Sequence, residues 1–230
     1  MQVSEWTRPA SRLDDLAMLH PRWPLYDLLL RTARLELKLP NEEQIGALCD
    51  VAAAGIHPPG EMPFGVAWTT KPRPAFEREF IQWHLKQRAD WTPDGWSLEL
   101  AVFLNGQPIG SQALAARQFA TFHAVNTGSW LGTGYQGRGF GAEMRGAVLA
   151  LAFDGLGAEL ATTEAFLDNL ASSGVSRSLG YAPNGLGSIA PEGVARETER
   201  FRMARLDWTG RSRPAVVIEG LDTCREMFGV

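Results

Sequence analysis

The segment from Asn126 to Arg145 reads NTGSWLGTGYQGRGFGAEMR and is the most informative stretch of this chain. Within it, Gly132 to Ala142 carry five glycines between a predicted strand over residues 124–131 and a predicted helix over residues 139–153. Glycine lets the backbone approach a ligand closely. The free N–H groups at the start of a helix, with the positive end of the helix dipole behind them, bind phosphate. The segment therefore predicts a strand, a phosphate-binding loop and a helix.

Two other kinds of phosphate loop share features with this segment. A P-loop requires Gly-Lys-Ser/Thr at the helix start, and this loop has no lysine. Gly132, Gly134 and Gly137 do spell the dinucleotide fingerprint G-x-G-x-x-G, which is weak on its own. Residues 126–131 lack the usual apolar run, and elements in a different order precede them, which argues against that fold. A turn without a ligand remains an alternative, although so many glycines carry an entropic penalty that a simple turn does not require.

Upstream of this segment the pattern predicts one strand and two helices. Residues 35–39 alternate between leucine and charged side chains, which is typical of a half-buried strand. Asn41 and Gln44 have the spacing of a capping box for a helix over 42–54 that stops at Gly55. A loop over 57–74 follows. The next helix, over 74–89, presents an apolar face that we interpret as core or pocket wall. Its members are Phe76, Phe80, Trp83 and Gln87.

Downstream and between these elements the pattern predicts mainly strands. Asn105-Gly106 joins predicted strands over 96–103 and 108–115, and Asn-Gly between apolar runs indicates a hairpin. The remaining predictions are strands over 124–131, 158–166, 201–206 and 216–219, and a helix over 169–179 that ends at Gly180. This order predicts a mixed α/β arrangement around a central sheet and lacks the regular alternation of a doubly wound fold.

Composition excludes several classes of protein. The formal net charge is -4 over 230 residues, and no basic stripe is visible, so we expect no nucleic-acid partner. The sequence contains no run of about 18 apolar residues, so we expect no membrane span. Acidic residues precede any apolar run at the start of the chain, unlike a secretory signal. We therefore expect a cytoplasmic protein.

The metal-binding side chains are scattered. Cys49 and Cys224 are far apart and match no zinc spacing or disulfide framework. No two of the four histidines lie four residues apart, so a helical metal site is not expected. The sequence predicts no metal.

Two motifs together resemble one known family. Gln136 to Gly141 resembles the Gln/Arg-x-x-Gly-x-Gly/Ala signature of the GNAT acetyltransferases, and residues 126–145 are similar to the subgroup that includes RimJ and RimL. Residues 166–181, FLDNLASSGVSRSLGY, resemble that subgroup's Asn-x-x-Ser motif ending in Leu-Gly-Tyr/Phe. The resemblance covers about residues 30–208. Trp23-Pro24-Leu25 and the stretch Gly128 to Gly132 are similar to actinobacterial members, among them a mycobacterial protein described as using succinyl-CoA.

The resemblance implies a GNAT fold, an α/β (α+β) arrangement with a mixed, mostly antiparallel sheet of about six or seven strands flanked by helices. We expect an N-terminal extension over 1–24 and a single domain over 25–230. The implied activity is transfer of an acyl group from acetyl-CoA or succinyl-CoA to a primary amine, without a covalent enzyme intermediate. The alternative is a non-catalytic acyl-CoA-binding or regulatory protein on the same fold. We expect a small-molecule or peptide amine as acceptor and a homo-oligomer.

The same resemblance implies roles for individual residues. The backbone from Gly137 to Ala142 would bind pyrophosphate, with Gln136 ordering the loop, and the backbone of the strand end would pair with pantetheine. Ser172 is the candidate proton donor to the leaving thiolate. The full predicted coenzyme-binding set is Trp130, Leu131, Gln136, Gly137, Arg138, Gly139, Gly141, Ala142, Asn169, Ser172 and Arg177.

Each of these roles has a simpler alternative. Asn169 and Ser172 are residue types that also cap helices, and Arg177 is equally compatible with an exposed helix position. The general base is left open between four side chains and a chain of water molecules. The four are Glu99, His123, Glu164 and Asp168.

Overall fold

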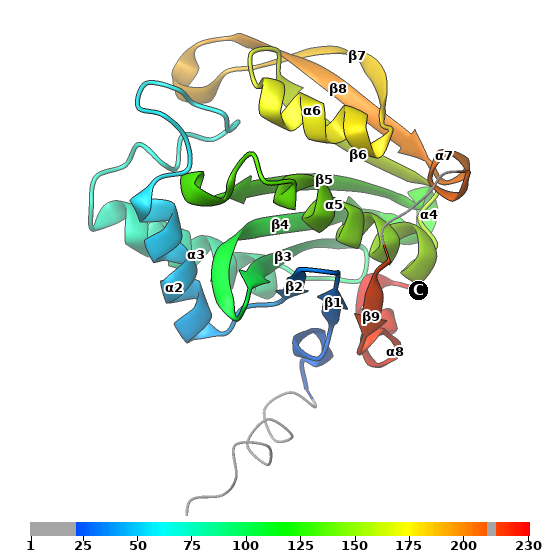
Figure 1. Cartoon of the computed structure of the whole chain (residues 1–230). Helices are drawn as coiled ribbons and strands as arrows, with labels where there is room; N and C mark the ends of the chain where they lie inside the picture. The colour runs from blue at the N-terminus through cyan, green and yellow to red at the C-terminus, as the bar shows by residue number, and fades with distance from the viewer. Residues whose placement is uncertain (1–21, 211–214) are drawn as a thin grey trace, which may run out of the picture.

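The computed structural model describes residues 22–210 and 215–230, and within them it forms a nine-stranded sheet flanked by helices (Figure 1). The predicted N-terminal extension over 1–24 lies outside the described residues except for its last three. The strands are β1 Leu29–Arg31, β2 Leu35–Lys38, β3 Gly95–Leu104, β4 Gln107–Arg117, β5 Ala124–Leu131, β6 Leu160–Phe166, β7 Ala182–Ile189, β8 Arg196–Ala204 and β9 Val217–Glu219.

Helices connect these strands on both faces of the sheet. The α-helices are α2 Glu42–Ala54, α3 Ala75–Ala89, α4 Phe119–Phe122, α5 Phe140–Ala150, α6 Leu170–Leu179, α7 Arg205–Thr209 and α8 Leu221–Cys224. The 3-10 helices are η1 Pro24–Tyr26, η2 Thr133–Tyr135, η4 Pro191–Gly193 and η5 Arg225–Phe228, and η3 Leu151–Gly155 is a π-helix.

The sheet is mixed and mostly antiparallel, as predicted. Its order is β7-β8-β6-β5-β4-β3-β2-β1-β9, and only the pair β5–β6 is parallel. The predicted count of six or seven strands is wrong, because β1 and β7 were not predicted. β7 reads APNGLGSI and lies exposed at the sheet edge, so it carries proline and glycine and no apolar alternation.

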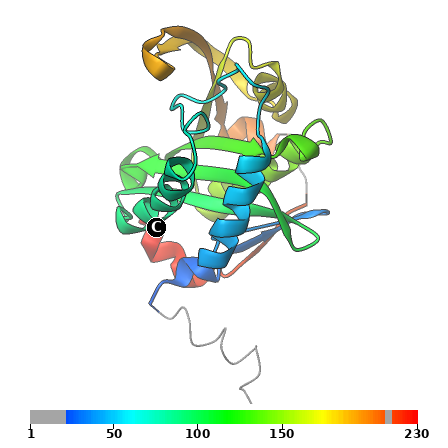
Figure 2. The same ribbon diagram turned by 90° about the vertical axis from the view of Figure 1, so that its left-hand side faces the viewer.

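Two hydrophobic layers cover the two faces of the sheet. On β3, Leu98 and Leu100 point into the core that contains α5. Ala101 and Phe103 of the same strand pack with residues of α2 and α3. Since neighbouring side chains on a strand point to opposite faces, α5 lies on one face and α2 with α3 on the other. Figure 2 shows α2 and α3 at the front, with β7 and β8 above the rest of the sheet.

Local chemistry explains where several elements begin and turn. The Asn41 side chain accepts a hydrogen bond from Gln44 N–H at 2.8 Å, and Asn41 N–H donates to Gln44 Oε1 at 3.1 Å. This confirms the predicted capping box. Asn105 and Gly106 have φ of 51° and 77°, which confirms the predicted hairpin between β3 and β4.

One predicted helix face is partly wrong. Phe76 and Phe80 of α3 are buried as expected, but Trp83 is 51% exposed and His84 takes the buried position one turn after Phe80. The apolar stripe therefore follows the spacing of four residues, and the indole lies on the solvent side.

The described residues contain neither a membrane-spanning helix nor a metal-binding cluster. No helix there combines the length and apolarity needed to cross a bilayer. Nor do three or more histidine, cysteine, aspartate or glutamate side chains gather into a metal-binding cluster among those residues.

Candidate functional site

The strands β5 and β6 are paired for only three residues and then part. Their register runs from Ala124 with Leu160 to Asn126 with Thr162. One residue further, Thr163 Oγ1 still donates to Thr127 O at 2.9 Å. β5 continues to its end paired only with β4 on its other side. The second half of β5 therefore has a free edge toward β6.

The backbone of β5 alternates between β4 and this free edge. Gly132 N–H donates to Ile109 O at 3.0 Å across the β4 side. Because successive residues of a strand direct their N–H and C=O groups to opposite sides, Leu131 and Ser129 face the opening. Trp130 pairs with Ser111 of β4. Ser129 and Leu131 thus offer hydrogen-bonding groups to an extended ligand beside β5.

Gln136 ties the glycine-rich loop to its surroundings. Its Nε2 donates to Leu131 O at 2.8 Å and to Ile56 O, beyond the end of α2, at 2.6 Å. After it, Gly137 and Gly139 have φ of 70° and 81°, a backbone conformation that side chains disfavour. The loop is therefore held at one end by an amide and turned into α5 by two glycines.

The N-terminus of α5 has no side-chain cap. Gly139 is the N-cap residue, and the first hydrogen bond of the helix runs from Glu143 N–H to Gly139 O at 3.2 Å. The N–H groups of Phe140, Gly141 and Ala142 precede that bond and point away from the helix body. This is the arrangement that binds a phosphate or pyrophosphate.

Two arginines flank this helix start. Arg34 Cζ lies 4.4 Å from the centre of the Phe140 ring, and Arg138 Cζ lies 5.1 Å from the same centre. Arg34 Nη1 donates to Arg138 O at 3.2 Å, and its Nε donates to Glu143 Oε2 at 2.7 Å. Burial alone would raise the pKa of Glu143, but hydrogen bonds from Thr32 and Arg34 hold it below its usual value. Arg34 comes from the turn between β1 and β2, and no sequence motif indicated it.

The glycines of the loop have different structural reasons. A Cβ at Gly132 would lie 2.8 Å from Val51 of α2, and one at Gly141 would lie 3.2 Å from Val175 of α6. A Cβ at Gly134 or Gly137 would meet no atom within 4 Å. Close packing explains the first pair, while Gly134 and Gly137 border open space.

The helix α6 begins beside the parted strands. Asn169 is its N-cap, and its Oδ1 accepts from Ser172 N–H at 3.0 Å, which is the capping role given above as the simpler alternative. Ser172 is half-buried, and its hydroxyl has no hydrogen-bond partner among the described residues. Arg177 is 2.5 Å from Glu199 Oε2 and lies over the Phe201 ring, so it is directed toward β8.

A buried arginine connects β5 to α6. Arg145 of α5 is 3% exposed, and its Nη2 donates to Ser129 Oγ and its Nη1 to Ser176 Oγ, each at 3.0 Å. Sequence reasoning did not single out this residue. Its spacing of three and four residues before Val148 and Leu149, both fully buried, was the available signal.

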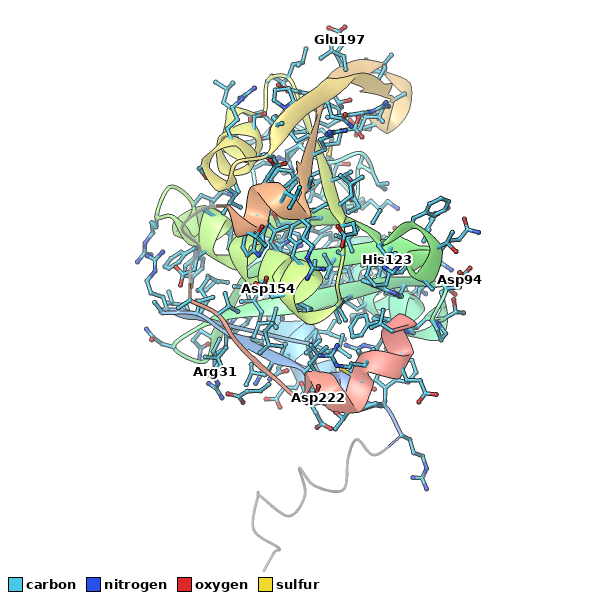
Figure 3. All side chains as sticks on the ribbon, turned by 90° about the vertical axis from the view of Figure 1, so that its right-hand side faces the viewer. Arg31, Asp94, His123, Asp154, Glu197 and Asp222 are labelled. Carbon is cyan, nitrogen blue, oxygen red and sulfur yellow. The ribbon has the colours of Figure 1, made fainter. Side chains whose placement is uncertain are left out.

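Three of the four candidate bases are occupied or remote. Glu164 accepts hydrogen bonds from Thr198 and from Arg200. Asp168 is held by Arg196 Nη2 at 2.9 and 2.8 Å. His123 lies just before β5, at the end where β5 and β6 are still paired, on the side of the molecule that carries Asp94 (Figure 3).

Glu99 is the fourth candidate and differs from these carboxylates. Ser97 Oγ donates to it at 2.8 Å, and the described residues give it no ion pair. Burial raises the pKa of Glu99. The register places it opposite Ala113 of β4, which in turn lies opposite Gly128 of β5. A Cβ at Gly128 would meet no atom within 4 Å, so only small side chains separate Glu99 from the parted end of β5.

An aromatic cluster borders β5 on the face of the sheet opposite α5. Trp130 lies 5.9 Å from Trp68 and 6.2 Å from Phe80, centre to centre, and Phe64 lies 5.2 Å from Trp68. These rings come from the loop after α2, from α3 and from β5. They form an apolar wall beside the opening, on the face opposite α5.

The parts of this site suit one kind of ligand. An uncapped helix start such as that of α5 is suited to an anionic phosphate group, and a free strand edge such as that of β5 is suited to an amide-containing chain. A long ligand with a pyrophosphate and a flexible amide arm satisfies both requirements. The predicted residues from Gly137 to Ala142 lie at the first part, and Leu131 and Asn169 border the second.

Comparison with known proteins gives matches over most of the chain. A family model described as "Acetyltransferase (GNAT) domain" matches residues 34–182. A GCN5-related N-acetyltransferase from Brucella melitensis has a TM-score of 0.63 at 20% identity, over 79% of this chain and 80% of that chain. A ribosomal-protein-S5-alanine acetyltransferase from Vibrio fischeri has a TM-score of 0.58 at 14% identity, over 78% and 98%.

A third solved structure contains a ligand. It is a RimL ribosomal L7/L12 alpha-N-protein acetyltransferase in complex with coenzyme A, with a TM-score of 0.61 at 16% identity, over 75% of this chain and 95% of that chain. At these identities the similarity to the three structures shows a shared fold.

Proposed function

The chain belongs to the GNAT family of N-acetyltransferases, and from this premise we propose that it transfers an acyl group from acyl-coenzyme A to a primary amine by direct attack on the thioester. The observation that carries the proposal is the combination of a parted strand pair, β5 and β6, with an uncapped start of α5 beside it. Coenzyme A has a pyrophosphate for the helix start and two amides for the strand edge.

The residues of the site fit this substrate. The N–H groups of Phe140, Gly141 and Ala142 would hold the pyrophosphate, with Arg138 adding positive charge at the same place, since Glu143 balances the charge of Arg34. Ser129 and Leu131 would hydrogen-bond the pantetheine arm. One of their N–H groups would also polarise the thioester carbonyl, where negative charge develops during attack.

The reaction moves two protons and exchanges one bond. The amine nitrogen attacks the carbonyl carbon, the C–N bond forms, and the C–S bond breaks to release the thiolate. Ser172, whose hydroxyl has no hydrogen-bond partner in the described part of the chain, would donate a proton to that sulfur. Glu99, the candidate carboxylate that has no arginine partner within residues 22–210 and 215–230, would accept the amine proton through water across Ala113 and Gly128. Water would then return a proton to Ser172.

The acyl group of the donor is either acetyl or succinyl in this proposal. Acetyl is the group carried by the family's name, whereas succinyl comes from the resemblance to actinobacterial members. A succinyl carboxylate requires a cation or several donors in the acyl pocket. A direct comparison of the two thioesters decides between them.

The acceptor is a small-molecule or peptide amine. The aromatic wall of Phe64, Trp68, Phe80 and Trp130 gives the acceptor side an apolar lining. Two structures with this fold are described as acetyltransferases of ribosomal proteins, so an N-terminal peptide amine is the first class to test. A homo-oligomer and a cytoplasmic location remain predictions.

Calorimetric titration of the full chain with acetyl-CoA, succinyl-CoA, CoA and NAD+ tests the proposal. Binding of an acyl-CoA more tightly than of CoA supports it and identifies the donor. Thiol release on adding peptide and polyamine acceptors then separates an enzyme from the alternative, a non-catalytic acyl-CoA-binding protein. Absence of binding to every CoA species would contradict the proposed function.

A further inference from the structure

Arg145 is a cation inside the protein that faces only hydroxyl groups. It is 3% exposed, its two Nη atoms donate to Ser129 and Ser176, and its Nε has no acceptor among the described residues. Buried arginines are normally paired with a carboxylate. The described part of the chain provides none for this one.

The charged and titratable groups around Arg145 confirm that its charge is uncompensated. On α5 itself, the nearest carboxylate is Glu143, which binds Thr32 and Arg34 on the other side of the helix. Between α6 and β7, Tyr181 is buried, and its hydroxyl is 3.3 Å from Thr127 Oγ1 of β5. Burial raises the pKa of Tyr181, so its phenol stays neutral. β5 and α6 contribute only the two serine hydroxyls.

Such a charge is unfavourable for folding alone. Removing a charged group from water without an opposite charge is strongly unfavourable, and an apolar side chain of similar volume is often more stabilising at such a position. A guanidinium retained there is explained if negative charge appears beside it during function.

The position of Arg145 matches the place where that charge would form. Ser129 lies on the parted end of β5, and Ser176 lies one turn after Ser172 on α6. Ser176 Oγ accepts from Arg145 and donates to Ser172 O at 3.1 Å. One guanidinium therefore connects the strand that would hold pantetheine to the helix turn that carries the candidate proton donor.

We propose that Arg145 is a positioning residue that fixes α6 against the parted end of β5 and stabilises the thiolate of coenzyme A as it leaves. The inference rests on the proposed function. When the C–S bond breaks, the electron pair goes to sulfur, and the resulting negative charge lies near the guanidinium until Ser172 delivers a proton. Arg145 acts through the serines and through its field, without a bond to the reacting atoms.

The test measures the pKa of the CoA thiol bound to the full chain, from the ultraviolet absorbance of the thiolate against pH. The protein's own thiols do not interfere below about pH 10, because burial raises the pKa of Cys49 and of Cys224 to about 11. Free CoA in the same buffer is the reference. Arg145→Met removes the charge, and Arg117→Met, at an exposed position, is the matched control.

We expect the bound thiol of the wild type and of Arg117→Met to have a pKa about 1 to 3 units below that of free CoA, the range for an opposite charge nearby. Arg145→Met should bind CoA with a thiol pKa near the free value. Its kcat should fall at least about 10-fold at unchanged KM for acyl-CoA, since a pKa change of one unit corresponds to a factor of ten. Its melting temperature should equal or exceed that of the wild type.

Several results would overturn the inference without touching the proposed function. One is tight CoA binding by the wild type with a thiol pKa equal to that of free CoA, which needs no variant and so does not depend on folding. Another is a bound thiol pKa in Arg145→Met that equals that of the wild type, together with a selective loss of succinyl-CoA binding. The arginine would then bind an acyl carboxylate. No CoA binding by the wild type would contradict the proposed function itself.

Discussion

Asn126 and Thr162 are the last paired residues of β5 and β6, and Asn126 Nδ2 donates to Thr162 O at 3.3 Å across the point where the two strands part. β4 pairs with the other edge of β5 from Val125 to Leu131, so the free edge is supported by a neighbouring strand. The end of β5 beyond Asn126 is therefore held in place by β4 on one side while its other edge is free.

Ala142→Glu is expected to abolish or strongly weaken CoA binding while preserving the fold. Ala142 is in the first turn of α5, where a carboxylate stabilises the helix through its dipole and adds negative charge at the proposed pyrophosphate position. Like charges brought together should lower CoA affinity at least about 10-fold. Calorimetric titration and thermal melting measure the two effects.

Ala142→Gln is the matched control for this change, because it has nearly the same volume without the charge. Equal loss of affinity in the two variants would mean that bulk, and not anion binding, explains the effect. Substitution of Gly139 or Gly141 is a poorer test, since Gly139 has φ of 81° and a Cβ on Gly141 would lie 3.2 Å from Val175.

Ser172→Ala is expected to lower kcat by about 100-fold with little change in the KM for acyl-CoA, the usual range for loss of a general acid. The Ser172 hydroxyl makes no hydrogen bond to the described residues, so its loss should not alter the melting temperature. Ser178→Ala, which removes a hydroxyl bound to Val175 O on the same helix, is the control. Steady-state kinetics that show the same kcat in both variants would exclude Ser172 as the acid.

Glu99→Gln is expected to change stability in a pH-dependent manner. Burial raises the pKa of Glu99, so the folded state holds this proton more tightly than the unfolded state. The wild type is therefore penalised as pH rises from about 4.3 through the folded pKa. The free energy of unfolding of Glu99→Gln, relative to the wild type, should be higher at pH 7 than at pH 4.

Urea titrations at the two pH values check this, with the exposed Glu61→Gln as control. A pH-independent difference would show that the Glu99 carboxyl is as well solvated as in the unfolded chain. If Glu99 accepts the amine proton, Glu99→Gln should also lose the part of kcat/KM that increases with pH.

His84→Leu is expected to improve stability under mild acid. Burial, with a smaller effect of Arg88, lowers the pKa of His84 from 6.5 to about 4. The folded state thus disfavours protonation, and stability declines as pH falls from 6.5 toward 4, by up to about 3 kcal/mol. His84→Leu should lose this decline.

His57→Leu, which removes a histidine hydrogen-bonded to Thr69, should retain the decline. Urea titrations between pH 7 and 4 measure it. If the wild type and His84→Leu lose stability in parallel over this range, His84 does not remain neutral in the folded protein.

Features set by local chemistry could be predicted from the sequence. Asn41 with Gln44 formed the predicted capping box, and Asn105-Gly106 formed the predicted hairpin, because each depends on residues within three positions. The glycine-rich loop between β5 and α5 was predicted for the same reason. The helix and strand that flank it follow from apolar periodicity.

Features set by contacts between distant segments could not be predicted from the sequence. Arg34 reaches Glu143 across 109 positions of sequence, and Arg145 reaches Ser176 across 31. The spacing of Arg145 to Val148 and Leu149 indicates a buried face of α5, but its serine partners on β5 and α6 depend on the tertiary arrangement. β7 was missed because its pairing with β8, and not its own side chains, makes it a strand.

The most direct test of the central claim is an amide NMR titration of the labelled full chain with CoA. The account predicts that the largest chemical-shift changes occur at the N–H groups of Ser129 and Leu131 and of residues 137–142, on the free edge of β5 and at the start of α5. Binding that leaves these amides unchanged and shifts others instead would contradict the account, because the parted strands and the glycine-rich loop would then not be the coenzyme site.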